Sequence, residues 1–259
     1  MYRCEVEANT AAIVCGGEGK RLSLAVNGLP KALIPIQKRP MLEHVIRDLS
    51  ANGIKNIFLL TRHQHGLITE TMLPLVQNVD VHLTSFYADV GKMEHILLFL
   101  DTVMTQESFL LLPGDHLFDD GIINALKAVP PRNGLILAVA CAQGTRDYGP
   151  MSSNCHKVCL NRNNDSIVAI GKDLQMFNAF DTGAYHWSVT LKDRLRIFLQ
   201  SGPPEKMKLS AFTQVLANEG LARYVNIGMK RWVNINTIQD LNIAERYLAQ
   251  RKRNRISSN

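Results

Sequence analysis

Residues 10–22 read TAAIVCGGEGKRL, in which a short apolar run ends in three closely spaced glycines. The apolar run has the length of a buried strand, and glycines behind a strand allow the backbone to approach a ligand closely. The glycine spacing matches neither G-x-G-x-x-G nor G-x-x-x-x-G-K-[ST], so it indicates neither a dinucleotide-binding loop nor a Walker-type phosphate loop. On its own the stretch is compatible with a nucleotide-binding turn and with an ordinary surface turn.

Strand and helix patterns alternate in the segment that follows. We expect helices over residues 40–52, 67–76, 92–102 and 121–129, and short apolar strands over residues 10–15, 57–60, 81–85, 109–112 and 135–141. Strands that alternate with helices imply βαβ units, whose strands are parallel and whose sheet is covered on both faces.

The second half of the chain has a more mixed pattern. Two apolar runs in residues 157–170 flank a polar turn, which is a hairpin signal. We also expect a helix over 207–218, strands over 222–227 and 232–235, and a last helix opened by Thr237 with Asp240 in a capping-box position. The whole pattern predicts an α/β fold with a mixed, mostly parallel sheet and a β-rich C-terminal lid over the active edge of that sheet. No linker interrupts it, so we predict a single domain over residues 1–250.

The composition argues against several classes of protein. The 259 residues carry 29 Lys+Arg against 23 Asp+Glu, a formal charge of +6, and four of the positive charges lie in residues 251–259. We expect this segment to be a disordered basic tail, and because little positive charge remains elsewhere, a nucleic-acid partner is not indicated. Neither a membrane-spanning run nor a signal-peptide pattern is present, so we expect a cytoplasmic protein without a membrane partner. Five cysteines without a C-x-x-C spacing favour neither disulfides nor a zinc site.

Several later segments of the sequence contain further motifs that belong with the segment 10–22. They read LPKALIPIQKRPML (29–42), LPGDH (112–116), IGKDL (170–174), FDTG (180–183) and WVNINT (232–237). GGEGKRL followed by the first of these resembles the signature of nucleotidyltransferases that activate sugars and other phosphorylated alcohols. LPGDH resembles the metal-binding Gly-Asp strand end of that family, and the last three segments resemble inositol-phosphate cytidylyltransferases in particular. The resemblance touches residues 11–248 and implies the Rossmann-like nucleotidyltransferase fold.

The resemblance implies transfer of a nucleotidyl group from a nucleoside triphosphate to an acceptor phosphate, with release of pyrophosphate. Arg21 would hold the triphosphate and the leaving group, and Lys31 would bridge the reacting phosphates. The loop residues that the resemblance assigns to the nucleotide are Cys15, Gly16, Gly17 and Gly19. Positioning and electrostatics supply nearly all of the catalysis, and no general base is needed because an acceptor phosphate is already ionised.

The resemblance also assigns residues to the acceptor and to a metal ion. Lys172 would bind the acceptor phosphate, and Asp181 would contact an acceptor hydroxyl or bond the backbone at a turn. Asp115 would hold Mg²⁺, a hard cation suited to carboxylate and phosphate oxygens. Asn234 takes the second metal position, where the family normally has an aspartate; its amide oxygen can bind Mg²⁺ but carries no charge. The ion would then depend more on triphosphate oxygens, or on another nearby acid.

The expected partners are CTP and a small phosphorylated or phosphonate acceptor of the inositol 1-phosphate or 2-hydroxyethylphosphonate type. CTP follows from the branch resemblance only. Two alternatives stay open: a sugar-1-phosphate nucleotidyltransferase that uses another nucleotide, and a nucleotide-binding regulatory protein without turnover, which the amide at Asn234 suggests. A homodimer is possible, and the sequence does not decide it.

Overall fold

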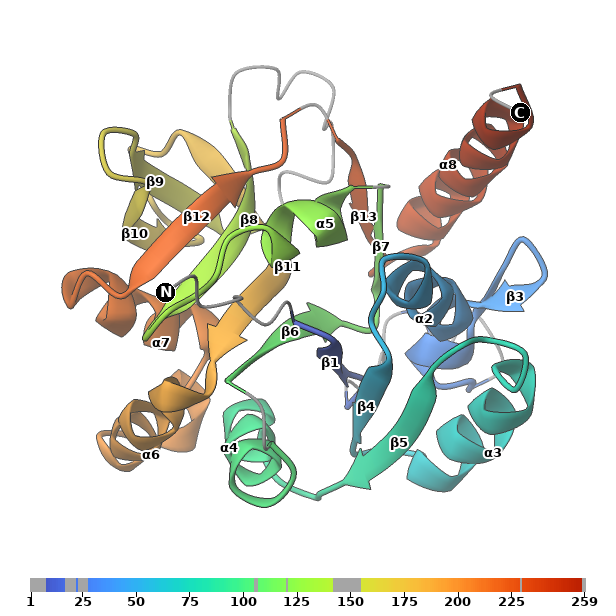
Figure 1. The fold of residues 1–259 in the computed structure, drawn as a ribbon, viewed down its shortest axis with the longest axis horizontal. Coiled ribbons are helices and arrows are strands. Elements are labelled where there is room, and N and C mark those ends of the chain that lie inside the picture. The colour runs from blue at the N-terminus through green and yellow to red at the C-terminus, as the bar shows by residue number, and fades with distance from the viewer. Residues whose placement is uncertain are drawn as a thin grey trace, which may run out of the picture.

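The computed structural model describes residues 8–16, 22, 28–104, 107–119, 121–141, 155–228 and 230–257. One mixed sheet of nine strands runs through it in the order β5-β4-β1-β6-β11-β8-β12-β10-β9 (Figure 1). The strands of this sheet are β1 (Thr10–Val14), β4 (Asn56–Thr61), β5 (His82–Tyr87), β6 (Ser108–Pro113), β8 (Leu135–Cys141), β9 (Lys157–Asn161), β10 (Ser166–Gly171), β11 (Ala179–Ser188) and β12 (Ala222–Asn226).

The first half of the sheet is parallel, as the alternating pattern predicts. β1 lies between β4 and β6 and is parallel to both, and β5 is parallel to β4. β12 and β8 form a further parallel pair, whereas β11 is antiparallel to both β6 and β8. The predicted α/β class with a mixed, mostly parallel sheet is therefore confirmed.

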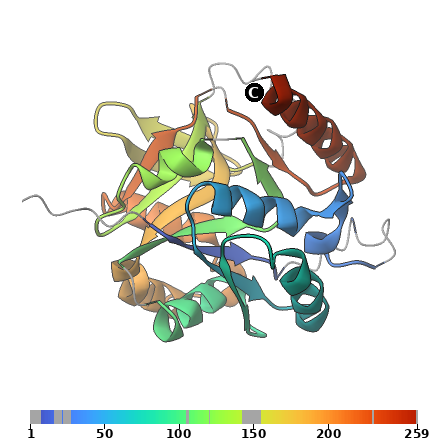
Figure 2. The same cartoon turned by 45° about the vertical axis from the view of Figure 1, so that its right-hand side comes forward.

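Helices cover both faces of the sheet, so its strands are apolar on both sides. In β1 the side chains of Ala11 and Ile13 belong to one buried cluster, and Ala12 between them belongs to the other. The first cluster contains side chains from α2 (Met41–Ala51), α3 (His65–Leu75) and α5 (Ile122–Lys127). The second contains side chains from α4 (Lys92–Thr102), α6 (Lys192–Gln200) and α7 (Leu209–Asn218). Figure 2 shows α4 and α6 together on one side of the strands and α2 on the other.

The C-terminal strands close into a ring rather than forming a separate layer. β9 pairs with β10 and also with β11, where Ala179 is opposite Val158. Because β11 pairs with β8, β8 with β12, and β12 with β10, each of these five strands has two neighbours within the ring. All five contribute to one buried cluster together with Phe212 and Leu216 of α7. The β-rich part that we expected as a lid is thus a continuation of the main sheet.

A small second sheet and the last helix complete the fold. β7 (His116–Phe118) pairs antiparallel with β13 (Trp232–Asn234), and β2 (Pro35–Ile36) pairs with β3 (Arg39–Pro40). Single helical turns occur at Lys31–Leu33, Val189–Leu191 and Pro204–Lys206. In the described part of the chain, no helix is both long enough and apolar enough to span a membrane.

The helix α8 (Ile238–Ser257) corrects the expectation of a disordered tail from residue 251. Its buried side chains Ala244, Tyr247 and Leu248 pack in a third cluster with Leu117 of β7 and Val233 of β13. The Arg251 guanidinium donates to both carboxylate oxygens of Asp48 at 2.8 Å, and to the Phe118 carbonyl oxygen at 3.2 Å. A charged residue in this run is therefore a docking contact and not a solvated charge. The single domain over residues 1–250 remains a prediction.

We predict that Arg251→Met lowers the free energy of unfolding by about 2–3 kcal/mol, because it leaves the Asp48 carboxylate without its bidentate partner. The two side chains are only 11% and 17% exposed, so water compensates little. Urea unfolding of both this variant and Arg246→Met, whose residue is exposed on the same helix, measures the effect. Equal losses in the two variants would show that the pair with Asp48 does not anchor α8.

Candidate active site

A cavity of about 300 Å³ opens where β1 and β6 end. In α/β proteins, ligands bind at the carboxyl ends of the strands, and this cavity follows that rule. The polar residues in its wall come from distant parts of the chain: Lys92, Asp115, His116, His156, Lys172, Asp181, Asn234 and Asn236. The structure thus brings together four residues that the sequence assigns to the site, namely Lys172, Asp181, Asp115 and Asn234.

Gly114 allows β6 to deliver Asp115 to this place. Its N–H donates to the Val14 carbonyl oxygen at 3.0 Å, at the end of β1. A Cβ atom on Gly114 would lie only 2.9 Å from the Cys15 sulfur and 3.2 Å from the Val14 oxygen. A larger residue would therefore push the two strand ends apart. The glycine of the LPGDH motif is needed for this close approach.

Both oxygens of the Asp115 carboxylate have partners. Lys31, in the helical turn Lys31–Leu33, donates to Oδ2 at 2.5 Å, and Nδ1 of His116 lies 2.7 Å from Oδ1. Burial opposes ionisation of Asp115, but His116 and Lys31 outweigh it and hold the pKa of this carboxyl well below its usual range. Asp115 is therefore a fixed negative charge, and Lys31 compensates it.

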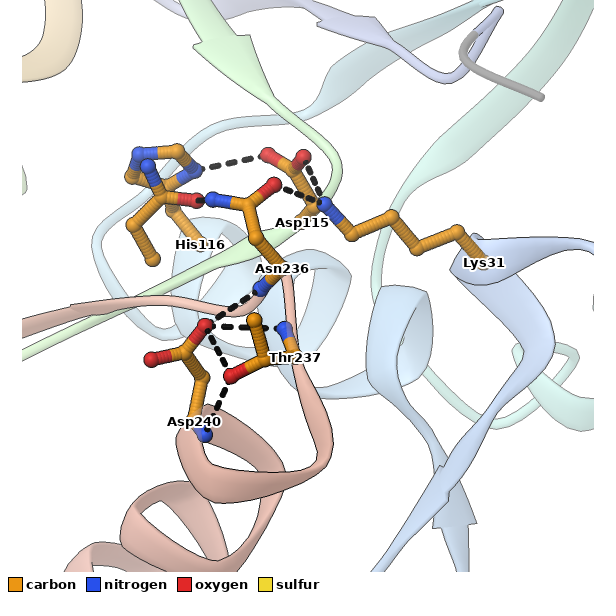
Figure 3. Close-up of polar contacts among 7 residues, drawn as sticks. Lys31, Asp115, His116, Asn236, Thr237 and Asp240 are labelled. Atoms are coloured by element: carbon orange, nitrogen blue, oxygen red, sulfur yellow. Dashed lines mark hydrogen bonds and ion pairs between the residues drawn. The ribbon is translucent and has the colours of Figure 1, made fainter. Parts of the chain in front are cut away.

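Two asparagines extend this contact toward α8 (Figure 3). Lys31 also donates to Oδ1 of Asn236 at 2.8 Å, and the Asn236 amide donates to Oδ1 of Asn234 at 2.7 Å. Asn234 is opposite His116 in the β7–β13 pair, and it lines the same cavity as Asp115.

The start of α8 fixes the backbone of Asn236. Oδ2 of Asp240 accepts hydrogen bonds from the N–H of Asn236 at 2.9 Å, and from the N–H and hydroxyl of Thr237 at 2.8 and 2.9 Å. The N–H of Asp240 donates in return to the Thr237 hydroxyl oxygen at 3.2 Å. The predicted capping box is confirmed, and it lies directly beside the site.

A bulge in β11 brings Asp181 into the cavity wall. The pairing of β11 with β8 shifts between Asp181 and Tyr185, and Gly183 within this interval has φ +82°. Oδ1 of Asp181 accepts the Gly183 N–H at 2.6 Å, and Oδ2 accepts the Tyr185 hydroxyl at 2.9 Å. Of the two roles expected for Asp181, the structure contains the backbone bond. A β-bulge often redirects a side chain in this way next to a functional site.

The part of the cavity around His156 is cationic. It is lined by Lys92, at the start of α4, by Lys172, just after β10, and by His156, just before β9. Burial is the main reason that the pKa of His156 lies below its ordinary value. Asp181, 3.9 Å from the ring nitrogen, opposes this shift, whereas three neighbouring lysines reinforce it: Lys172, Lys92 and Lys208. At neutral pH we therefore expect a neutral imidazole among ammonium groups.

Part of the predicted nucleotide loop lies outside the described residues, including Gly17, Gly19 and Arg21. Gly16 packs against the chain after β4, where an added Cβ would lie 3.2 Å from Cβ of Arg62. The Cys15 thiol is buried, lies 3.5 Å from the Ile13 carbonyl oxygen, and has its pKa raised by burial. Its side chain is therefore part of the core, and only its backbone is available for a ligand.

Sequence reasoning missed Lys92, His156, Tyr185 and Asn236. Lys92 and His156 have ordinary sequence neighbours, and only the ring of strands brings His156 toward Asp181. Asn236 is two residues from Asn234 in the WVNINT segment, so its position in that motif was the available signal.

The residues around Asp115 fit a magnesium ion only in part. Asp115, Asn234 and Asn236 offer hard oxygen atoms, which suit Mg²⁺. Each of these side chains already accepts a hydrogen bond from the protein, and Lys31 compensates the single carboxylate. Among the described residues, no three His, Cys, Asp or Glu side chains are grouped as metal ligands. This donor set fits an ion that arrives with the negative charge of its nucleotide, and it does not fit a free ion.

We predict that Gly183→Ala destabilises the protein by about 1–3 kcal/mol more than Gly220→Ala does. Both glycines have positive φ, but an added Cβ at Gly220 meets no atom within 4 Å. At Gly183 it would lie 3.2 Å from the Pro113 ring and 3.4 Å from His116 Nε2. Urea unfolding of the two variants isolates this contact. Equal losses would mean that the bulge can move away from His116 without cost.

The comparisons with known proteins agree with this geometry. The sequence model of the nucleotidyl transferase family matches residues 10–251. The bifunctional IPC transferase and DIPP synthase of Aquifex aeolicus (strain VF5) is 24% identical over 247 residues, which are 93% of this chain and 52% of the relative. The D-glycero-alpha-D-manno-heptose 1-phosphate guanylyltransferase of Aneurinibacillus thermoaerophilus is 30% identical over 109 residues, 42% of this chain and 46% of the relative. This chain thus spans about half the length of these curated relatives.

A solved structure shows the same fold. The inositol-1-phosphate CTP transferase from T. maritima superposes with a TM-score of 0.77 at 20% sequence identity, over 93% of this chain and 95% of that one. The match to the family model extends over nearly the whole chain, and it includes the strand end that carries Asp115 and the loop that carries Asn236. The chain belongs to the nucleotidyl transferase family.

Proposed function

We propose that the protein is a CTP-dependent cytidylyltransferase that transfers CMP to a small phosphate or phosphonate alcohol and releases pyrophosphate. One observation carries this proposal: the wall of a single cavity contains Asp115, which Lys31 contacts, together with Lys92 and Lys172. Because Lys31 and the two other lysines come from separate segments of the chain, the cavity can attract two anionic substrates. A site for two anions is what transfer between phosphates requires.

In the proposed reaction, an oxygen of the acceptor's phosphate or phosphonate forms a bond to the α-phosphorus of the nucleotide. The bond from that phosphorus to the bridging oxygen breaks, and pyrophosphate leaves with the electron pair. Lys31 would act on the charge of the reacting phosphates, and Lys172 with Lys92 would hold the acceptor anion. His156, expected to be neutral, would donate or accept a hydrogen bond there and needs to remove no proton. The lysines supply positioning and charge stabilisation, which dominate such catalysis.

Magnesium is part of this proposal. Bound with the triphosphate, it would withdraw charge from the phosphate oxygens, and Asp115 and Asn234 would hold it. Because the side chain of Asn234 is an uncharged amide, the magnesium ion would depend more on the oxygens of the nucleotide as ligands.

The identity of both substrates is supported by the relatives. The named activities of the relatives from Aquifex aeolicus and T. maritima support CTP and an inositol phosphate. We include 2-hydroxyethylphosphonate as a second small acceptor. A sugar 1-phosphate with another nucleotide is the second candidate, and the likeness to the heptose 1-phosphate guanylyltransferase favours it.

We expect pyrophosphate release with CTP, Mg²⁺ and one acceptor from a panel of inositol 1-phosphate, 2-hydroxyethylphosphonate and hexose 1-phosphates. Lys31→Ala should lower kcat about a hundredfold to a thousandfold, because one charge contact to the transition state is worth about 3–4 kcal/mol. Lys252→Ala, at an exposed lysine near the end of α8 that does not line the cavity, is the control. Highest activity with another triphosphate supports the second candidate. Nucleotide binding without turnover for any pair would instead support a regulatory protein.

We also predict that Asn234→Asp lowers the Mg²⁺ concentration needed for half-maximal rate, and that Asp115→Asn raises it. The aspartate keeps the oxygen that accepts the Asn236 amide and adds a negative charge beside Asp115. Without metal the two carboxylates repel each other, so the melting temperature of the Asn234→Asp protein should fall and then recover with Mg²⁺ and CTP. Magnesium titrations of both variants measure this. An unchanged magnesium dependence in Asn234→Asp would remove Asn234 from the metal site.

A further inference from the structure

Asn236 lies between Lys31 and the cavity. Its side chain lines the cavity, accepts from Lys31 through Oδ1 at 2.8 Å and donates to Asn234 through Nδ2 at 2.7 Å. Figure 3 shows its amide pointing toward the Lys31 ammonium, beside the Asp115 carboxylate. In the proposed reaction above, no step uses this residue.

The contacts of the Lys31 ammonium explain why an acceptor is needed at this position. A lysine side chain is flexible and carries three N–H donors. Asp115 accepts one of them at 2.5 Å and Asn236 accepts another at 2.8 Å. Two acceptors fix the direction of the ammonium, whereas Asp115 alone would let it turn about a single contact. Among the described residues these two acceptors are the side-chain partners of the ammonium, which leaves one N–H donor for a phosphate oxygen.

The chemical type of the residue also matters. An amide oxygen accepts a hydrogen bond from an ammonium without adding a negative charge. A carboxylate at the same place, together with Asp115, would surround the Lys31 charge with two negative charges and weaken its attraction to a phosphate. Asn236 therefore orients the ammonium and preserves its charge.

We propose that Asn236 is a positioning residue for Lys31, and that the Thr237–Asp240 cap of α8 holds Asn236 in place for this task. The proposal rests on the proposed function for the catalytic role of Lys31, but the orientation of Lys31 can be measured without turnover. Asp240 does not contact Lys31 itself. Its carboxylate accepts the N–H of Asn236 at 2.9 Å, so the first turn of α8 helps to hold Asn236 in place.

The fold offers a matched control for Asp240. Asp119 also fastens α8 and the β13 segment, because it accepts from the Tyr247 hydroxyl and from the Arg231 N–H, both at 2.7 Å. Neither of these contacts reaches Lys31 or Asn236. Asp240→Asn and Asp119→Asn should therefore both lower the melting temperature, and only the first should affect Lys31.

The first experiment observes the ammonium directly in the free protein. We expect a ¹H–¹⁵N signal of the Lys31 ammonium in protein labelled with ¹⁵N-lysine, assigned by its loss in Lys31→Met, because two acceptors slow its hydrogen exchange. Asn236→Ala and Asp240→Asn should broaden this signal beyond detection. Asp119→Asn should leave it intact, and Asn236→Asp should restore it, since a carboxylate oxygen also accepts. A signal that persists in Asn236→Ala, or that disappears equally in Asp119→Asn, overturns the proposal.

The second experiment uses the reaction. Asn236→Ala should lower kcat about tenfold to a hundredfold, as expected for a misplaced catalytic group, with a much smaller change in the KM for CTP. If Asn236 acts through Lys31, the double variant Lys31→Ala/Asn236→Ala should be within about twofold of Lys31→Ala alone. Multiplicative losses would mean that Asn236 acts independently, and the proposal would be wrong. Absence of turnover in the wild type would reject the proposed function, while the ammonium signal would still decide the role of Asn236.

Discussion

The contact between the Lys31 ammonium and the Asp115 carboxylate is the interaction on which the rest of the site depends. It joins residues 84 positions apart in the sequence, and the bond from Lys31 to Asn236 adds a third segment 205 positions away. Removing both charges from water is costly, and a pair of this kind is stable only where further hydrogen bonds satisfy it. His116 and Asn236 supply those bonds. This cluster requires three features of the fold. They are the close approach of β6 to β1 at Gly114, the β7–β13 pair and the cap of α8.

The ring of strands forms the part of the cavity around His156. Pairing of β9 with β11 brings His156 toward Asp181, and the bulge in β11 places the Asp181 carboxylate where it faces that ring nitrogen. The Asp181 oxygens accept hydrogen bonds from the Gly183 N–H and the Tyr185 hydroxyl, so this carboxylate supports the wall. Its negative charge acts on His156 in the direction opposite to that of the neighbouring lysines. The cavity wall consequently contains Asp115, which Lys31 contacts, and the lysines that act on His156. The topology brings these groups together, since no sequence motif contains both.

Local patterns predicted much of the fold and a part of the site. Helical spacing gave α2 and α4, the apolar run before LPGDH gave β6 and the place of Asp115, and Thr237 with Asp240 gave the start of α8. These features depend on neighbours in the sequence. The β11–β9 pairing, the bulge at Gly183 and the pair Arg251–Asp48 depend on residues far apart, and they were not predicted. The basic run after residue 250 illustrates the reason: charge alone indicates solvent exposure, whereas the partner of Arg251 is on α2.

The amides of Asn234 and Asn236 have an electrostatic consequence for Lys31. Every anionic group near Lys31 competes with a phosphate for its charge, and Asp115 already supplies one. With amides at both positions, the ammonium keeps an acceptor for its orientation and stays available to an incoming anion. The same amides add no negative charge to that of Asp115, so this group of oxygens offers little attraction to a free divalent ion. At Asn236 the amide acts on the orientation of Lys31, and at Asn234 it acts through its bond to Asn236.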